Sequence, residues 1–152
     1  YGYEDFAAEA TGRYLRGLST VFQKTNTLWE MYAPDSYQPG TVVDGKEIAR
    51  KDFVGWTGCG PIALLIENIL GLRADGVNHR LTWRISRTDR HGIKGVGVGG
   101  ATVSLVCGKR KSKSAPVRIT VEANRSVELV IVLPGRIERF QLSRGKCVVS
   151  VG

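Results

Sequence analysis

The spacing of apolar residues changes at Gly71, and this change divides the chain into two parts of different structure. Before Gly71, apolar residues recur every three or four positions, as they do along one face of an α-helix. After Gly71, apolar and polar residues alternate, as they do in strands with one buried face. The sequence therefore predicts a helical domain over residues 1–72 and a β domain over residues 73–152.

Two helices are expected in the first domain. One runs from about Glu4 to Phe22 with a single apolar stripe. The other begins near Gly60-Pro61, because proline suits the first helical position, and ends before Gly71, because glycine suits the position just past a helix. Residues 61–70 are apolar on almost every face, so we expect neighbouring structure to bury this helix.

The second domain is expected to be a small antiparallel β-sandwich. Its predicted strands cover residues 81–85, 102–107, 117–123, 127–133, 136–142 and 147–151. The glycines between residues 92 and 100 do not form a phosphate-binding loop, because no Gly-Lys-Ser/Thr follows them and no helix opens after them. They predict bulges or irregular pairing at a sheet edge instead.

A long loop between the two helices carries the candidate chemistry. It begins with Trp29-Glu30-Met31-Tyr32 and ends with Asp52-Phe53-Val54-Gly55-Trp56. Long loops without regular structure in a compact domain are usually functional or disordered. A carboxylate among aromatic rings suits a sugar-cleaving site, where the carboxylate activates water and the rings stack on the sugar. The alternative interpretation is that the aromatic residues pack an interface and that Glu30 is a solvated acid.

Charge is distributed unevenly between the two domains. Residues 1–72 carry 6 Lys and Arg against 9 Asp and Glu, whereas residues 73–152 carry 16 against 5. Such asymmetry raises the question of an acidic partner. The basic residues are nevertheless scattered through strand-like segments, apart from the short run 109–113, and no aromatic residues are interleaved with them. We therefore expect no nucleic-acid partner, and no apolar run has the length of a membrane span.

The three cysteines indicate neither a metal site nor a compartment. Cys59, Cys107 and Cys147 show no zinc-binding spacing, and the two histidines, His79 and His91, do not complete a site. We expect no metal and no cofactor. Cys107 and Cys147 lie in apolar strand patterns, so buried thiols are the default, and a disulfide would require their strands to pair. The compartment stays open, with a periplasmic or secreted location among the options.

The order of these motifs resembles the C-terminal end of a glycoside hydrolase group that includes trehalases and the processing α-glucosidases of family 63. The resemblance rests on Thr27–Tyr32, Asp52–Trp56 and Gly60–Glu67. It implies an (α/α)6 barrel that hydrolyses α-glycosidic bonds with inversion. The expected fold class is therefore α+β: the last helical hairpin of an (α/α)6 toroid with its active-site loop, over residues 1–72, followed by a C-terminal antiparallel β-sandwich.

The resemblance also implies roles for individual residues. Glu30 lands on the general base of the family. Trp29, Tyr32, Asp52 and Trp56 land on positions that line or support the sugar site. The family's general acid, an Asp, lies far upstream of this motif, and nothing in the chain matches it.

Other acids of the chain do not replace the missing general acid. Glu4 and Asp5 have the character of helix-start charges and Asp35 that of a turn acid. We therefore expect a fragment of a longer protein that is inactive alone. Its expected partners are an α-glucoside-like carbohydrate and either the missing N-terminal portion of the barrel or a second copy bound through residues 61–70.

A hypothesis from a different class is a non-catalytic β-sandwich module that binds carbohydrate or serves as a structural accessory. A carbohydrate-binding face needs two or three coplanar rings. The β domain has only Trp83 and Phe140, and both alternate with polar neighbours as core residues do. The exposure of these two side chains decides whether the module can bind sugar by stacking.

Overall fold

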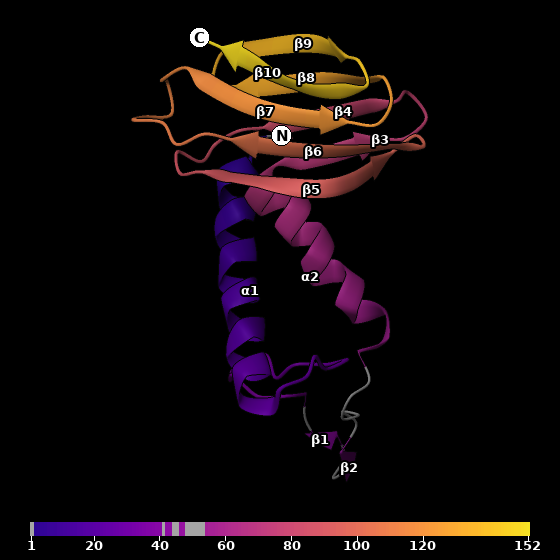
Figure 1. Ribbon diagram of the computed structural model, residues 1–152. Coiled ribbons are helices and arrows are strands. Elements are labelled where there is room, and N and C mark those ends of the chain that lie inside the picture. Colours follow the sequence, from indigo (N-terminus) through magenta and orange to yellow (C-terminus); the bar gives the residue numbers. More distant parts are fainter. Residues whose placement is uncertain (1, 41, 44–45, 48–53) are drawn as a thin grey trace. The chain divides into compact units, whose positions relative to one another are not determined.

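The computed structural model describes residues 2–40, 42–43, 46–47 and 54–152. The chain divides into two compact units, Tyr1–Ile69 (unit 1) and Leu70–Gly152 (unit 2) (Figure 1). The division lies beside Gly71, where the apolar spacing of the sequence changes. Each unit is built from the type of secondary structure that this spacing indicates.

Unit 1 begins with the helix α1 (Glu4–Thr25), which extends the predicted helix by one turn. Leu18 and Val21 bury their side chains on its apolar stripe. The helix ends because Asn26 adopts a left-handed φ of 56° and donates its backbone N–H to the carbonyl of Phe22 at 2.7 Å. Thr11 is buried too, and its hydroxyl accepts a hydrogen bond from the Asn68 amide at 3.1 Å.

The second helical segment of unit 1 changes its hydrogen-bonding pattern twice. It consists of the 3-10 turn η1 (Gly55–Gly58), the α-helix α2 (Cys59–Leu64) and the π-helix η2 (Leu65–Leu70). In α2 and η2, all of whose side chains are described, no residue is buried, and Ile62 is 60% exposed. The expectation that neighbours bury this segment is therefore wrong for the described structure. Two short strands, β1 (Val42–Val43) and β2 (Lys46–Glu47), pair antiparallel before it.

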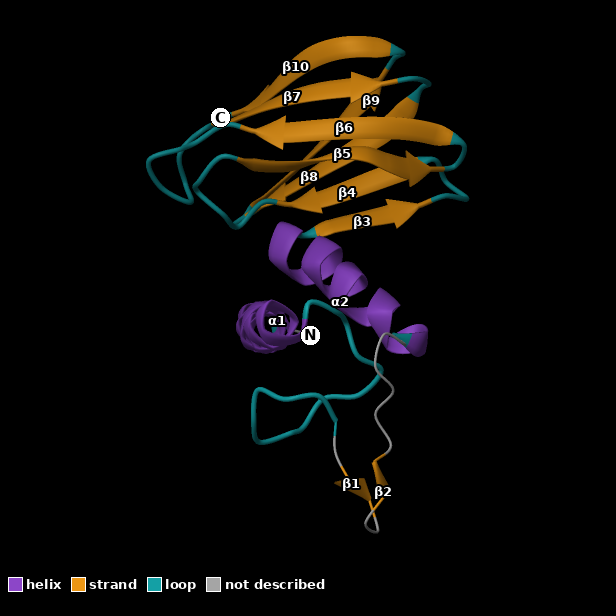
Figure 2. Cartoon of the chain, turned by 60° about the horizontal axis from the view of Figure 1, so that its bottom comes forward, coloured by secondary structure: helices purple, strands orange, loops and turns teal. Residues whose placement is uncertain are grey.

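Unit 2 contains eight strands in two sheets of four (Figure 2). One sheet has the order β10-β7-β6-β5, and the other has the order β3-β4-β8-β9. The strands are β3 (Leu72–Asp75), β4 (Arg80–Arg84), β5 (His91–Val98), β6 (Ala101–Cys107), β7 (Val117–Ala123), β8 (Val127–Leu133), β9 (Arg136–Leu142) and β10 (Gly145–Val151).

The sandwich is not purely antiparallel, because β4 and β8 pair in parallel. Between them the chain forms β5, β6 and β7 in the other sheet. Three strands that alternate in direction return the chain to the first sheet running the same way as β4. The register sets Arg80 opposite Glu128, and the two side chains form an ion pair.

The predicted fold class, the last helical hairpin of an (α/α)6 toroid followed by an antiparallel β-sandwich, is wrong. The described structure is mostly β, with 40% strand, two sheets of four strands and two short helices. Apolar periodicity indicates that a segment is helical, but it does not identify what that segment packs against. A toroid hairpin needs two helices that bury each other's apolar faces, and α2 with η2 buries none of its residues.

The core of unit 2 is formed by the alternate residues of each strand that face the opposite sheet. Val103 and Leu105 of β6 and Ile119 and Val121 of β7 are fully buried. Trp83 is also fully buried, and its indole N–H donates to the Leu70 carbonyl at 2.8 Å. The alternation in the sequence therefore identifies the buried face correctly.

The glycine-rich run forms the edge strand β5, which carries a register shift between Ile93 and Val96. Gly95 lies in this irregularity with a φ of 71°. Gly92 lies so close to β6 that a Cβ would be 2.1 Å from the carbonyl oxygen of Leu105. The prediction of irregular edge pairing in this run is therefore confirmed.

The cysteines of unit 2 occupy different strands and different environments. Cys107 lies in β6 and is buried, which raises the pKa of its thiol by desolvation. Cys147 lies in β10 and is exposed, so the default expectation of a buried thiol is wrong there. Each of these strands pairs with β7 and not with the other, and both thiols are free among the described residues.

A buried arginine ties together two loops at one end of the sandwich. Arg110 is 7% exposed. Its Nε donates to the Arg87 carbonyl at 3.1 Å, its Nη1 to the Lys113 carbonyl at 2.8 Å and its Nη2 to the Ile85 carbonyl at 2.8 Å. The guanidinium thus satisfies three carbonyl groups from segments far apart in the sequence.

Replacing Arg110 by Met is expected to destabilise unit 2 by about 3 kcal/mol, because the three carbonyls lose their donor in a buried site. Amide hydrogen exchange of the slowest amides in β6 and β7 measures this loss. Lys109→Met, which changes the exposed neighbouring residue, is the matched control. Equal exchange rates in the two variants would show that the arginine does not stabilise the sandwich.

Candidate functional site

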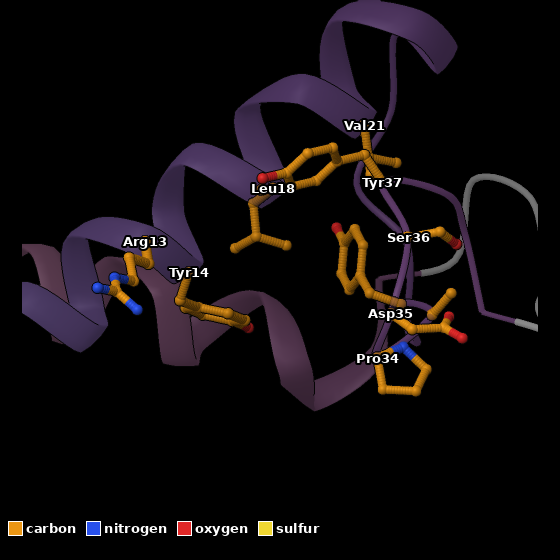
Figure 3. A pocket seen from close by; sticks show the side chains of 11 residues that line it. Arg13, Tyr14, Leu18, Val21, Pro34, Asp35, Ser36 and Tyr37 are labelled. Carbon is orange, nitrogen blue, oxygen red and sulfur yellow. The ribbon is translucent and has the colours of Figure 1, made fainter.

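A cleft of about 380 Å³ lies within unit 1 between α1 and the loop of residues 32–37 (Figure 3). We call it the tyrosine cleft, because Tyr14, Tyr32 and Tyr37 line it. Its remaining walls are formed by the polar residues Arg13, Asp35 and Ser36 and by the small or apolar residues Gly17, Leu18, Val21, Ala33 and Pro34. It therefore combines aromatic surface with groups that form hydrogen bonds.

The loop that forms one wall of the cleft is closed on itself. Gly40 donates its N–H to the Met31 carbonyl at 2.7 Å, and Tyr32 forms a β-bridge with Pro39. A Cβ on Gly40 would lie 2.5 Å from the Cβ of Met31, so this closure requires glycine. Residues 31–40 thus present Tyr32 and Tyr37 to α1 from a defined backbone.

Gly17 on α1 receives one of these rings. A Cβ at Gly17 would lie 3.5 Å from Cε1 of Tyr37, which shows that the ring rests against the helix at this position. The sequence suggests that Gly17 lets a neighbouring helix approach α1. The structure shows that the group which approaches it is a tyrosine ring of the closed loop.

Hydrogen bonds also hold the segment that leads into the cleft. The backbone N–H of Trp29 donates to the phenol oxygen of Tyr32 at 2.9 Å. The indole N–H of Trp29 donates to the Thr25 hydroxyl at 3.0 Å, and that hydroxyl donates to the Val21 carbonyl at 2.9 Å. Trp29 is buried, at 9% exposure, so it supports the end of α1 and offers little ring surface to a ligand.

The structure places the predicted site residues as follows. Trp29, Glu30 and Tyr32 lie in one short segment, in which Glu30 is half-buried. Among the described residues of this segment, Tyr32 lines the tyrosine cleft, and Trp29 and Glu30 do not. Asp52 lies outside the described residues, and so does the side chain of Trp56.

Sequence reasoning missed part of the cleft. Tyr14 occupies the same helical stripe as Leu18 and Val21, and this spacing predicts packing. Tyr37, 61% exposed, had no periodic signal because it lies in a loop. Asp35, which the sequence indicates to be a turn acid, is the carboxylate among the described residues that line the cleft.

The surroundings of Tyr14 favour its neutral form. Partial burial raises the pKa of the Tyr14 phenol above its ordinary value of 10.0, and the neighbouring Tyr32 phenol raises it further. Tyr14 therefore keeps its proton, and with it a hydrogen-bond donor, to higher pH than a solvated tyrosine. An aromatic ring with a polar tip suits a ligand that has both an apolar face and hydroxyl groups.

No metal site accompanies the cleft: within the described ranges, no three His, Cys, Asp or Glu side chains gather in a way that could hold an ion. For that part of the chain, neither helix combines the length and the apolar character needed to cross a bilayer.

No family model, no curated protein and no solved structure matches the chain.

Replacing Tyr32 by Phe is expected to remove the acceptor of the Trp29 N–H and to weaken local protection by about 1 kcal/mol. Amide hydrogen exchange at Trp29 measures the loss. Tyr37→Phe is the matched control, because the same atom is removed from a phenol of the same cleft. Unchanged exchange at Trp29 in the Tyr32 variant would mean that this hydrogen bond does not hold the segment.

The raised pKa of Tyr14 predicts a loss of stability in alkaline solution. Its contribution is fully present below the ordinary value of 10.0 and is lost as the pH rises through the raised pKa, because the unfolded chain ionises first. Urea unfolding at increasing pH should therefore show a steeper alkaline loss for the wild-type chain than for Tyr14→Phe. Parallel curves would contradict the assignment.

Proposed function

We propose that unit 1 supplies the general-base side of a site that hydrolyses α-glycosidic bonds with inversion, with Glu30 as the base and the tyrosine cleft as a sugar-binding surface. The observation that carries the proposal is the setting of Glu30. Glu30 is a half-buried residue in a segment where the backbone N–H of Trp29 donates to the Tyr32 phenol and the indole N–H of Trp29 donates to the Thr25 hydroxyl. The motif in which it lies resembles that of inverting α-glycosidases.

The proposed chemistry is a single displacement at the anomeric carbon. Glu30 takes a proton from a water molecule, and the water oxygen forms a bond to the carbon as the bond to the leaving oxygen breaks. The leaving oxygen needs a proton from an acid, and in inverting enzymes the two carboxyl groups are about 6.5–9.5 Å apart. Because nothing in the chain matches the family's acid, the chain is expected to be inactive toward ordinary α-glycosides when alone.

The cleft contributes binding groups for the sugar. The rings of Tyr14 and Tyr37 can lie against the apolar face of a pyranose, and Arg13 and Ser36 can hydrogen-bond its hydroxyls. Asp52 and Trp56 stay predicted contacts from the motif. The proposed substrate is an α-glucoside-like carbohydrate, and the proposed partner is the polypeptide segment that carries the acid.

The rival hypothesis of a sugar-binding β-sandwich is not favoured as a stacking module. Trp83 is fully buried, and Phe140, the other aromatic residue of unit 2 apart from its histidines, is half-buried. No pair of exposed rings is therefore present among the residues of unit 2, all of which are described. A structural accessory role for unit 2 is compatible with its complete core.

An α-glucosyl fluoride tests the base without the missing acid, because fluoride leaves without being protonated. The full chain is expected to release fluoride faster than buffer does and to form β-glucose first, as inversion requires. Glu30→Gln should slow this release by about 100-fold or more, which is the size of a lost general base. A fluoride electrode measures the rate, and proton NMR identifies the anomer.

Two control variants make this experiment specific. Glu67→Gln removes an exposed carboxylate of the same unit and should leave the rate unchanged. Asp35→Asn removes the carboxylate that lines the cleft. If Asp35→Asn lost the activity and Glu30→Gln kept it, the base would be Asp35 and not Glu30. If the wild-type chain released fluoride no faster than buffer does, the proposed function would be rejected.

A further inference from the structure

Unit 2 has a groove of about 520 Å³ at the end of the sandwich where three turns meet. The β3–β4 turn contributes Asn78 and His79, the β5–β6 turn contributes Gly99, and the β7–β8 turn contributes Arg125 and Ser126. Gln141 of β9 adds one further side chain. These groups are polar and come from distant parts of the sequence, so no sequence motif predicts that they lie together.

The groove is preformed, because close contacts between the turns fix the positions of its walls. His79 has a left-handed φ of 48°, which is uncommon for a residue other than glycine, and its carbonyl accepts the Glu128 N–H at 2.9 Å. The imidazole lies directly on the β5–β6 turn. A Cβ on Gly99 would be 2.3 Å from its Nδ1 and 2.6 Å from the Gly76 carbonyl oxygen, so only glycine fits there.

Glu128, the carboxylate among the described residues that line the groove, is already paired with two arginines. Glu128 accepts hydrogen bonds from Arg80 on one oxygen and from Arg139 on the other, the latter at 3.1 Å. These bonds lower the pKa of Glu128, chiefly through Arg80, and keep it ionised. Asp75 accepts a bond from the Asn78 amide at 2.6 Å.

Arg125 is the charged residue of this groove that is not paired with another described residue. Within the described ranges its guanidinium makes no hydrogen bond or ion pair, and its Nη1 would be 3.7 Å from a Cβ at Gly100. The planar guanidinium presents donors in a geometry that matches a carboxylate or phosphate. An oxyanion is therefore the ligand group that fits this position.

The amide side chains of the groove leave acceptors for hydroxyl groups. Gln141 donates its amide N–H to the Ser126 hydroxyl at 2.9 Å, and that hydroxyl donates to the Leu142 carbonyl at 3.0 Å. This chain orients Gln141 so that its carbonyl oxygen stays available. The amide oxygen of Asn78 is available in the same way, because its nitrogen is bound to Asp75.

We propose that this groove binds a sugar that carries an oxyanion, either a carboxylate or a phosphate. Arg125 holds the oxyanion, and Asn78 and Gln141 accept hydrogen bonds from the hydroxyls. Because unit 2 has no exposed aromatic pair, recognition depends on polar contacts and is weak. The proposal does not depend on Glu30, which belongs to unit 1.

Three probes with the same ring test the proposal: glucuronate, glucose 6-phosphate and glucose. Amide NMR shifts of Asn78, Gly99 and Ser126 in the full chain report binding. At least one anionic probe is expected to bind with a Kd on the order of 1 mM, and glucose should bind much more weakly. Comparison of the two anionic probes identifies whether the carboxylate or the phosphate is preferred.

Matched variants assign the binding to Arg125. Arg125→Gln should weaken binding of the anionic probe about tenfold, and Arg125→Lys should retain part of the affinity because it keeps the charge. Arg118→Gln removes the same charge from an exposed arginine at the other end of β7 and should have little effect.

Three results would overturn the proposal. The first is the absence of shifts at the three amides with both anionic probes at 20-fold the expected Kd, or about 20 mM. The second is equal affinity for glucose, and the third is equal weakening by Arg118→Gln and Arg125→Gln. Because these measurements use groups of unit 2, their failure leaves the fluoride-release test of Glu30 unaffected.

Discussion

The parallel pairing of β4 with β8 determines where the turns that form the groove of unit 2 lie. Three strands of the other sheet separate β4 from β8, so the chain re-enters the first sheet in the same direction. As a consequence, the β3–β4, β5–β6 and β7–β8 turns all emerge at one end of the sandwich. The groove that carries Arg125 exists because of this arrangement, and the Arg80–Glu128 ion pair lies across the pairing that produces it.

In unit 1, a loop brings residues from different parts of the sequence together. The closed loop of residues 31–40 holds Tyr32 and Tyr37 against α1, and the bond from Trp29 to Tyr32 extends the ordered segment through Glu30. Glu30 lies next to Trp29, whose hydrogen bonds fix the backbone of this segment, and a backbone positioned in advance suits a residue proposed to act on a bound water. The proposed base and the proposed sugar surface thus adjoin each other along the backbone.

The sequence predicted the secondary structure of each segment better than it predicted what each segment packs against. Alternation identified β6, β7, β8 and β9 within a residue of their observed bounds, because each pattern reflects the burial of one face of one strand. The buried environment expected for residues 61–70 was wrong, because an apolar helix does not specify what covers it. For the candidate site, the motif around Glu30 was visible in the sequence. The cleft was not visible, since Tyr14 is 18 residues before Tyr32 and meets it only through the path of the loop.

By itself the sequence determined the change from helix to strand near Gly71, the helix α1, the buried faces of β6 and β7 and the irregular edge pairing of β5, because these depend on interactions between residues close together in the chain. The tertiary structure alone decided the parallel pair, the placement of Cys147 on an exposed position and the assembly of the tyrosine cleft and of the groove around Arg125. Those features depend on contacts between distant segments. Their energies come from register and packing across strands and loops, which no local pattern of residue types contains.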